Sequence, residues 1–219
     1  MKKSIRVPKV NITASEIEAS QGELIRKTNA EVHTIDSLNW KEFSYLPTVR
    51  FSIAYSNEGI YLWFEVKETT AKATILDDNG PVYNDSCVEF FIDAAGDGTY
   101  YNFEINCIGT LLLGYGNSRH NRLQAPFDIL NAVKRWPSLG KNIIDNSGRE
   151  TVWEVSVFLP NKAFWMHSIT DFTERKAPAN FYKCGDKTAM RHYVSWNPIT
   201  TEKPDFHRPE FFGELVFTT

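Results

Sequence analysis

Alternating hydrophobic and polar positions run through most of this chain and predict β-strands. The clearest alternation covers residues 48–55 and 60–68, with a short turn between them that is typical of a β-hairpin. The same pattern predicts further strands at 87–93, 100–107, 110–115, 152–159, 180–184, 192–197 and 212–217. Many short strands with little helix indicate an all-β fold, and we expect an antiparallel, jelly-roll-like β-sandwich.

Three segments depart from the alternation. One short helix is expected at 161–167, because Pro160 and Asn161 suit a helix start. Residues 1–45 are interpreted as an irregular N-terminal arm packed on the sandwich. Residues 114–150 show weak periodicity and are expected to form long loops at one edge, where binding groups concentrate. The length of 219 residues favours a single domain over residues 1–219.

The hairpin at 87–107 has two chemically different faces. Side chains in a strand alternate between faces, so Val88, Phe90 and Ile92 share one apolar side. The opposite side collects carboxylates and amides, and its members are Glu89, Asp93, Asn102, Glu104 and Asn106. This mixture favours binding of a hydroxyl-rich ligand. A solvated or salt-bridged sheet face is the alternative.

Glu89 and Glu104 are expected to lie opposite each other across this hairpin. Like charges in that position repel, so something must compensate. The compensation could be an arginine such as Arg119 or Arg122, a bound cation, a raised pKa or the hydroxyls of a ligand.

Composition and charge remove several classes of function. The net charge of -3 and the lack of a basic stripe argue against nucleic acid. No run of ~20 apolar residues predicts a membrane span. The N-terminus lacks the apolar region of a signal peptide, so the chain as given is expected to be cytoplasmic, or exported if a signal was removed. Cys87 and Cys107 point to opposite faces, which disfavours a disulfide between them, and no cysteine or histidine spacing suggests zinc.

The run YNDSCVEFFID at 83–93 resembles a signature of the family 9 carbohydrate-binding modules. YNFEIN at 101–106, SWNP at 195–198 and FFGELVF at 211–217 look like later strands of the same family, in the same order. The resemblance extends from about residue 45 to the C-terminus. It implies a non-catalytic β-sandwich that binds a mono- or oligosaccharide of plant-type glycans and serves polysaccharide breakdown.

The resemblance also implies roles for single residues. Two aromatic rings clamp a sugar in this family, and the matching positions are Tyr83 and, by motif order, Trp196. Glu89 and Asn106 match the carboxylate and amide that bind sugar hydroxyls. Glu104 stands where the family has a basic residue, which puts the family's sugar preference in doubt. Three further side chains are candidates for hydroxyl contacts, namely Asn102, Glu104 and Arg119.

Calcium is a further possibility, although no cofactor is required. Asp93, Asp97 and the loop carbonyls between them offer the oxygen ligands that calcium prefers. A plain acidic turn is the alternative. The resemblance itself implies structural calcium in related modules.

Other functions remain open at this stage. A glycoside hydrolase could use Glu89 and Glu104 as its pair of carboxylates, although two residues on a flat sheet face rarely form a cleft. An interaction module without sugar binding would explain the departure at Glu104. The rings of Tyr83 and Trp196 could also simply pack in the core.

Overall fold

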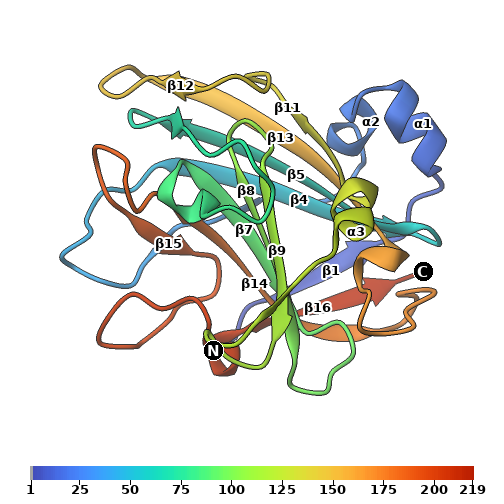
Figure 1. Cartoon of the computed structure of the whole chain (residues 1–219). Helices are drawn as coiled ribbons and strands as arrows, with labels where there is room; N and C mark the ends of the chain where they lie inside the picture. The colour runs from blue at the N-terminus through green and yellow to red at the C-terminus, as the bar shows by residue number, and fades with distance from the viewer. Residues whose placement is uncertain (1) are drawn as a thin grey trace.

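The computed structural model describes residues 2–219, which form two facing β-sheets (Figure 1). The larger sheet has nine strands. Along it lie β1 (Ser4–Pro8), β16 (Gly213–Thr218), β14 (Lys176–Cys184), β7 (Cys87–Ile92), β8 (Tyr100–Asn106), β9 (Leu111–Gly116) and β10 (Leu123–Gln124), with β15 (Tyr193–Ser195) and β3 (Ser37–Leu38) branching from β14. The predicted β-sandwich is therefore confirmed.

The smaller sheet has five strands and covers the inner face of the larger one. Its order is β11 (Lys134–Pro137), β13 (Thr151–Pro160), β5 (Gly59–Glu68), β4 (Thr48–Ser56) and β2 (His33–Thr34). A separate two-stranded ribbon joins β6 (Lys72–Ala73) to β12 (Ile144–Asp145). The apolar sides of both sheets meet in one core, where the rings of Phe51 and Phe181 stack 4.0 Å apart.

Helical structure is sparse, as predicted, but most of it lies at other positions than the sequence suggested. The α-helices are α1 (Ala14–Ala19), α2 (Glu23–Arg26) and α3 (Phe127–Ala132), and the 3-10 turns are η1 (Val82–Asn84), η2 (Asn161–Ala163) and η3 (Pro209–Phe211). The helix expected at 161–167 is thus wrong beyond one turn. Phe164 ends that turn with a non-helical ψ of 53° and is completely buried, because its ring packs into the core.

The N-terminal arm is more regular than expected. Strand β1 pairs in parallel with β16, and its Ile5 and Val7 are buried while Ser4 and Arg6 face solvent. Helix α1 begins with a capping box, in which the backbone N–H of Thr13 donates to the Glu16 carboxylate at 2.8 Å. The arm therefore completes the larger sheet. Its alternation is too short for the sequence pattern to reveal. The segment 114–150, expected as long loops, likewise contains the short elements β10, α3, β11 and β12.

Both faces of the larger sheet are covered, and this decides the nature of the site. The outer face carries a second cluster of apolar side chains, made mainly of aromatic rings from β7, β8, β14 and the loop before β16. Its members include the rings of Phe91, Tyr100, Tyr182, Phe206 and Phe212. The polar side chains of the hairpin are consequently buried, whereas the sequence suggested an open sheet face.

Candidate functional site

A cleft of about 540 Å³ opens through this outer cover of the larger sheet. Its floor is formed by strand residues, and its walls come from η1 and from the loops around 119–124, 186–193 and 204–207. The floor consists of Glu89 on β7, Asn102 and Glu104 on β8, Leu112 and Gly114 on β9, and Cys184 on β14. Of the predicted site residues, the structure brings together Tyr83, Glu89, Asn102, Glu104 and Arg119.

Two buried carboxyl groups dominate the floor. Glu89 and Glu104 are directly paired across β7 and β8, as expected, and are 3% and 4% exposed. Burial raises the pKa of Glu104 to about 7, and burial together with the Cys184 thiol raises the pKa of Glu89 well above its usual range. The raised pKa of Glu89 favours its protonated form, which relieves the repulsion that two opposed carboxylates would cause.

Glu104 has one satisfied oxygen and one free oxygen. Its Oε1 accepts a hydrogen bond from Asn102 Nδ2 at 2.9 Å. Its Oε2 is buried and has no hydrogen-bond partner among residues 2–219. A buried polar atom without a hydrogen-bond partner is uncommon in folded proteins, so this oxygen is a candidate acceptor for a ligand.

Arg122 holds this arrangement in place. Its Nε donates to Asn102 Oδ1, and its two Nη atoms donate to the carbonyls of Tyr100 and Ser118, each at 2.8 Å. The guanidinium also lies over the Tyr100 ring, 4.3 Å from the centroid. Arg122 thus fixes the Asn102 amide so that its NH₂ group faces Glu104. The sequence suggested Arg122 only as a countercharge, since hydrogen bonds to distant backbone carbonyls leave no sequence signal.

Gly114 provides the space for this contact. A Cβ atom at Gly114 would come within 2.5 Å of Asn102 Oδ1, so any larger residue would displace the amide. The glycine lies on β9 directly opposite Asn102 on β8. A glycine inside a strand often marks such a close approach.

The cleft also presents apolar surface. Tyr83 lies in η1 with 40% of its surface exposed, and it lines the cleft together with Tyr193 and Phe206. The sequence analysis did not select Tyr193. Strand parity could have found it, because Tyr193 lies on the face of β15 opposite to the core residue Val194.

Two predicted site residues belong to the scaffold instead. Trp196 is 3% exposed and packs in the core against Phe51 and Phe181, with ring centroids 6.4 and 5.8 Å away. Its ring lies on the core side of the sheet and cannot stack on a ligand in the cleft. Trp196 shares the strand parity of Val194, and the structure confirms the alternative in which its ring packs in the core.

Asn106 is the second correction. It is completely buried, and its Nδ2 donates to Ile75 O and Asp85 Oδ2, both at 2.9 Å. Its Oδ1 accepts from the backbone N–H groups of Ile108 and Thr110. These four contacts use the whole amide, so Asn106 stabilises the turn after β8 and does not reach the cleft.

The calcium candidates lie in a tight turn. The Asp93 carboxylate accepts from the backbone N–H groups of Gly96, Asp97 and Gly98 at 2.6, 3.2 and 2.9 Å. Asp97 accepts from the Thr99 N–H and contacts His167 Nε2 at 3.2 Å. These oxygens face N–H donors here, and calcium at this turn stays a prediction.

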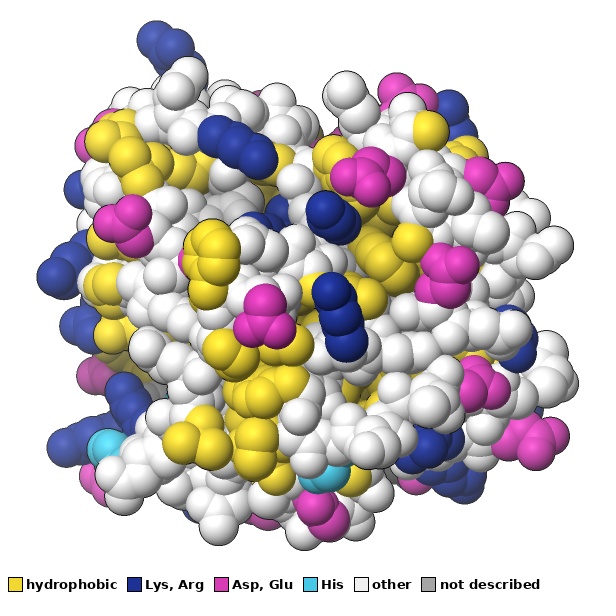
Figure 2. All heavy atoms as spheres, turned by 45° about the vertical axis from the view of Figure 1, so that its right-hand side comes forward, with side chains coloured by type: hydrophobic (Ala, Val, Ile, Leu, Met, Phe, Trp, Pro, Cys, Tyr) yellow, Lys and Arg dark blue, Asp and Glu magenta, His cyan; other side chains and the backbone are white. Residues whose placement is uncertain are grey.

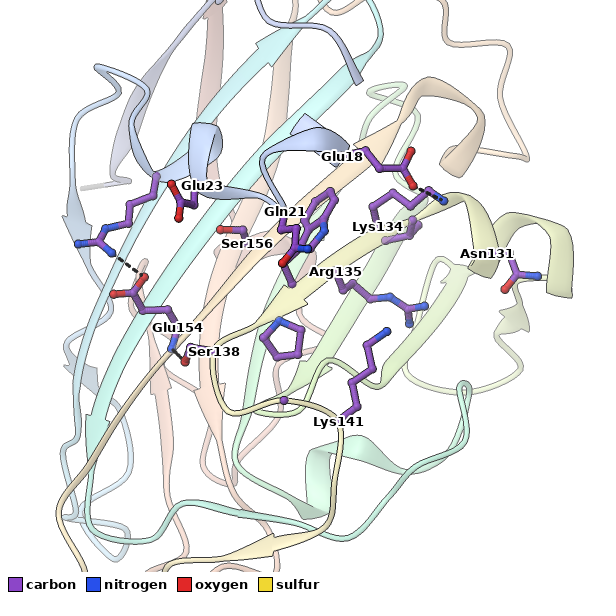
Figure 3. A pocket seen from close by; sticks show the side chains of 15 residues that line it. Glu18, Gln21, Glu23, Asn131, Lys134, Arg135, Ser138, Lys141, Glu154 and Ser156 are labelled. Carbon is purple, nitrogen blue, oxygen red and sulfur yellow. Dashed lines mark hydrogen bonds and ion pairs between the residues drawn. The ribbon is translucent and has the colours of Figure 1, made fainter. Parts of the chain in front are cut away.

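A second, larger cleft lies on the outer face of the smaller sheet (Figure 3). It has a volume of about 710 Å³ and is bordered by α2, β11 and β13. Figure 3 shows its charged side chains pointing toward one another. Lys134 lies 3.6 Å from Glu18, and Arg26 lies 3.5 Å from Glu154. These two ion pairs lie at the solvent-accessible surface, so we place the candidate site in the first cleft.

Surface charge and helix length describe the remaining exterior of the molecule. On the face drawn in Figure 2, lysine and arginine side chains lie singly among aspartate and glutamate side chains, without a continuous basic field. Within residues 2–219, no helix has the length and apolar character that crossing a membrane requires.

Comparisons with known proteins agree with this description. A structure from Bacteroides uniformis, described as a candidate carbohydrate-binding protein, is 41% identical, with a TM-score of 0.92 and coverage of 99% of this chain and 100% of that chain. Two structures of a family 9 carbohydrate-binding module from Caldicellulosiruptor kristjanssonii, one with glucose and one with cellotriose, share the fold. Both have TM-scores of 0.61, with 13% and 14% identity, and cover 98% and 99% of this chain and 95% and 94% of theirs.

No curated protein matches the chain. The pattern of carbohydrate-binding family 9 matches residues 19–217, which is most of the sequence. This match agrees with the resemblance carried by the strand signatures. The chain therefore belongs to carbohydrate-binding family 9 and is a carbohydrate-binding domain.

Proposed function

We propose that the cleft over Glu89 and Glu104 binds a mono- or oligosaccharide of plant-type glycans reversibly, without chemistry, in the service of polysaccharide breakdown. The observation that carries the proposal is the buried Glu104 Oε2 without a partner at the floor of an open cleft. Leaving such a group unsatisfied destabilises a fold by about 1–3 kcal/mol. A sugar hydroxyl is the right size and chemistry to satisfy it.

The neighbouring groups suit a sugar in orientation as well as chemistry. Asn102 is held by Arg122 and already donates to Glu104, so a ligand meets a prearranged set of donors and acceptors. Prearranged groups lose little freedom on binding, which favours affinity. Asp186, Arg119 and Asp205 at the walls offer further contacts for hydroxyls.

Tyr83 supplies the stacking surface in this proposal. Sugar rings present C–H groups on one face, and burying those groups against an aromatic ring contributes affinity. The half-exposed ring of Tyr83 can accept such a contact, and Tyr193 or Phe206 can border the opposite side. The relatives solved with glucose and with cellotriose support these sugars as the first ligands to test.

The test is calorimetric titration with glucose, xylose, cellobiose and cellotriose. We expect saturable heat with at least one sugar, and an affinity about 10-fold or more weaker in Tyr83→Ala, because truncating a central aromatic contact typically removes more than about 1 kcal/mol. Trp136→Ala, a half-buried ring in the second cleft, is the matched control and should keep the wild-type affinity within about twofold.

Three outcomes would contradict the proposal. The absence of binding heat with every sugar would contradict the binding function. Unchanged affinity in Tyr83→Ala would mean that the site lies elsewhere. Release of new reducing ends from cellotriose would indicate hydrolysis, and Glu89→Gln would then lose turnover while still binding sugar.

A further inference from the structure

Two cysteines and a carboxyl group lie together at one end of the cleft floor. Cys87 begins β7 and Cys184 ends β14, and the two residues are direct partners in the antiparallel ladder. Glu89 is two residues further along β7, so its side chain points to the same face. The two sulfur atoms and a carboxylate oxygen of Glu89 all lie within 4.8 Å of one another.

The strand geometry argues against a disulfide between the two cysteines. The Asp93 N–H donates to Pro178 O at 2.8 Å, and counting along the ladder from this bond makes Cys87–Cys184 a hydrogen-bonded pair. Cβ atoms in such pairs are separated by roughly 5.5 Å, whereas a disulfide needs about 3.8 Å. The thiols face each other at a separation that an intervening atom could bridge.

We propose that Cys87, Cys184 and Glu89 form a binding site for a thiophilic divalent ion, such as Zn²⁺, at the floor of the cleft. Thiolate and carboxylate groups are established zinc ligands, with bonds of about 2.3 and 2.0 Å and a preference for four ligands. The chain supplies three of them. Cys184 and Glu89 line the cleft, so the fourth position is open to water or to a ligand entering from the cleft.

The contacts within the cluster show that the three groups can share one site. Cys184 Sγ donates to Glu89 Oε1 at 3.0 Å, and an ion would replace the proton in this bond. When the ion binds, each cysteine releases its thiol proton and Glu89 releases its carboxyl proton to solvent. Because each ligand must lose its proton, affinity should increase with pH. This inference does not rest on the proposed sugar binding.

Cys107 provides a matched control. It is also completely buried, but it lies on the core side of the sheet, where its Sγ contacts Lys72 O at 3.7 Å. Changing Cys107 to serine therefore introduces the same chemistry in the same sheet without touching the proposed site.

The experiment uses the full chain, reduced with a phosphine, and titrates it with Cd²⁺ and with Zn²⁺. Cd²⁺ binding is followed by the ultraviolet charge-transfer absorption of cadmium thiolates, and Zn²⁺ stoichiometry by native mass spectrometry. We expect one ion per chain in the wild type and in Cys107→Ser. Cys87→Ser and Cys184→Ser should each weaken binding about 100-fold, and Glu89→Gln about 10-fold.

Several results would overturn the site. One is the absence of any bound ion on folded wild-type protein, and another is a loss of ion affinity in Cys107→Ser as large as in the site variants. A third is a mass two hydrogens lower with both thiols unreactive to alkylation, which would indicate a disulfide. Near-ultraviolet circular dichroism verifies that each variant is folded, and Cys184→Ala replaces Cys184→Ser if the serine variant does not fold. Ion binding unchanged in both Cys184 variants would equally exclude the proposal.

Discussion

The two clefts of this sandwich differ in what their polar groups contact, and only one resembles a binding site. The cleft on the smaller sheet is larger, at about 710 against 540 Å³, yet four of its charged side chains form two ion pairs at the surface. The cleft on the larger sheet contains buried carboxyl groups, one of which has an oxygen without a partner within residues 2–219. We therefore chose the candidate site by its unsatisfied, desolvated groups and not by its volume.

The difference arises from what covers each sheet. Loops and aromatic rings cover the outer face of the larger sheet and exclude water from Glu89 and Glu104. On the smaller sheet, α2 and Trp136 cover only part of the outer face, so Arg26 stays 62% exposed and Glu154 26% exposed. Water solvates an exposed charge, whereas a buried polar group needs a hydrogen-bond partner.

The largest expected effect is the difference in stability between variants of two arginines, one in each cleft. Arg122→Ala leaves the buried Asn102 Oδ1 and the Tyr100 carbonyl without their donors, so we expect the free energy of unfolding to fall by about 4 kcal/mol. Arg26→Ala removes one exposed ion pair and should change it by less than about 1 kcal/mol. Urea denaturation measures both. Equal losses in the two variants would erase the distinction between the clefts.

The next effect concerns pH and stability. Folded Glu104 keeps its proton up to about pH 7, whereas an unfolded glutamic acid loses it near 4.5, so the folded state binds more protons between these values. Its contribution to stability therefore decreases as pH rises through this window, by about 3 kcal/mol in total. Glu104→Gln lacks this titration and should gain about that much relative to wild type between pH 4.5 and 7. Parallel stability curves for the two proteins would show that Glu104 titrates normally.

The smallest effect concerns pH and sugar affinity, and it depends on the proposed function. Ionised Glu104 accepts hydrogen bonds from hydroxyls more strongly than the neutral acid does. With a pKa of about 7, the ionised form becomes dominant above neutral pH. We expect affinity to increase about 3- to 10-fold from pH 6 to pH 8 by calorimetry, and to stay constant in Glu104→Gln. An affinity that decreases with pH would mean that the neutral acid donates to the sugar.

Sequence pattern predicted most of the strands and part of the site. Alternation located nearly all long strands, and the short turn at 94–98 set the register that opposes Glu89 to Glu104. Alternation also places Trp196 on the core side with Val194 and Tyr193 on the opposite side, but the alignment by motif order selected Trp196 for the site. The short strand β1 and the helices of the arm were also missed, because five or six residues contain too few repeats to be recognised.

The sequence by itself determined the sandwich, the family and the paired glutamates, because strand alternation and hairpin register are local properties. Only the tertiary structure decided that the polar hairpin face is buried, that Arg122 orients Asn102, and that Cys184 meets Cys87 across β14 and β7. These outcomes depend on contacts between segments far apart in the chain. Burial in particular is set by the loops that cover a sheet, and periodicity within a strand contains no information about them.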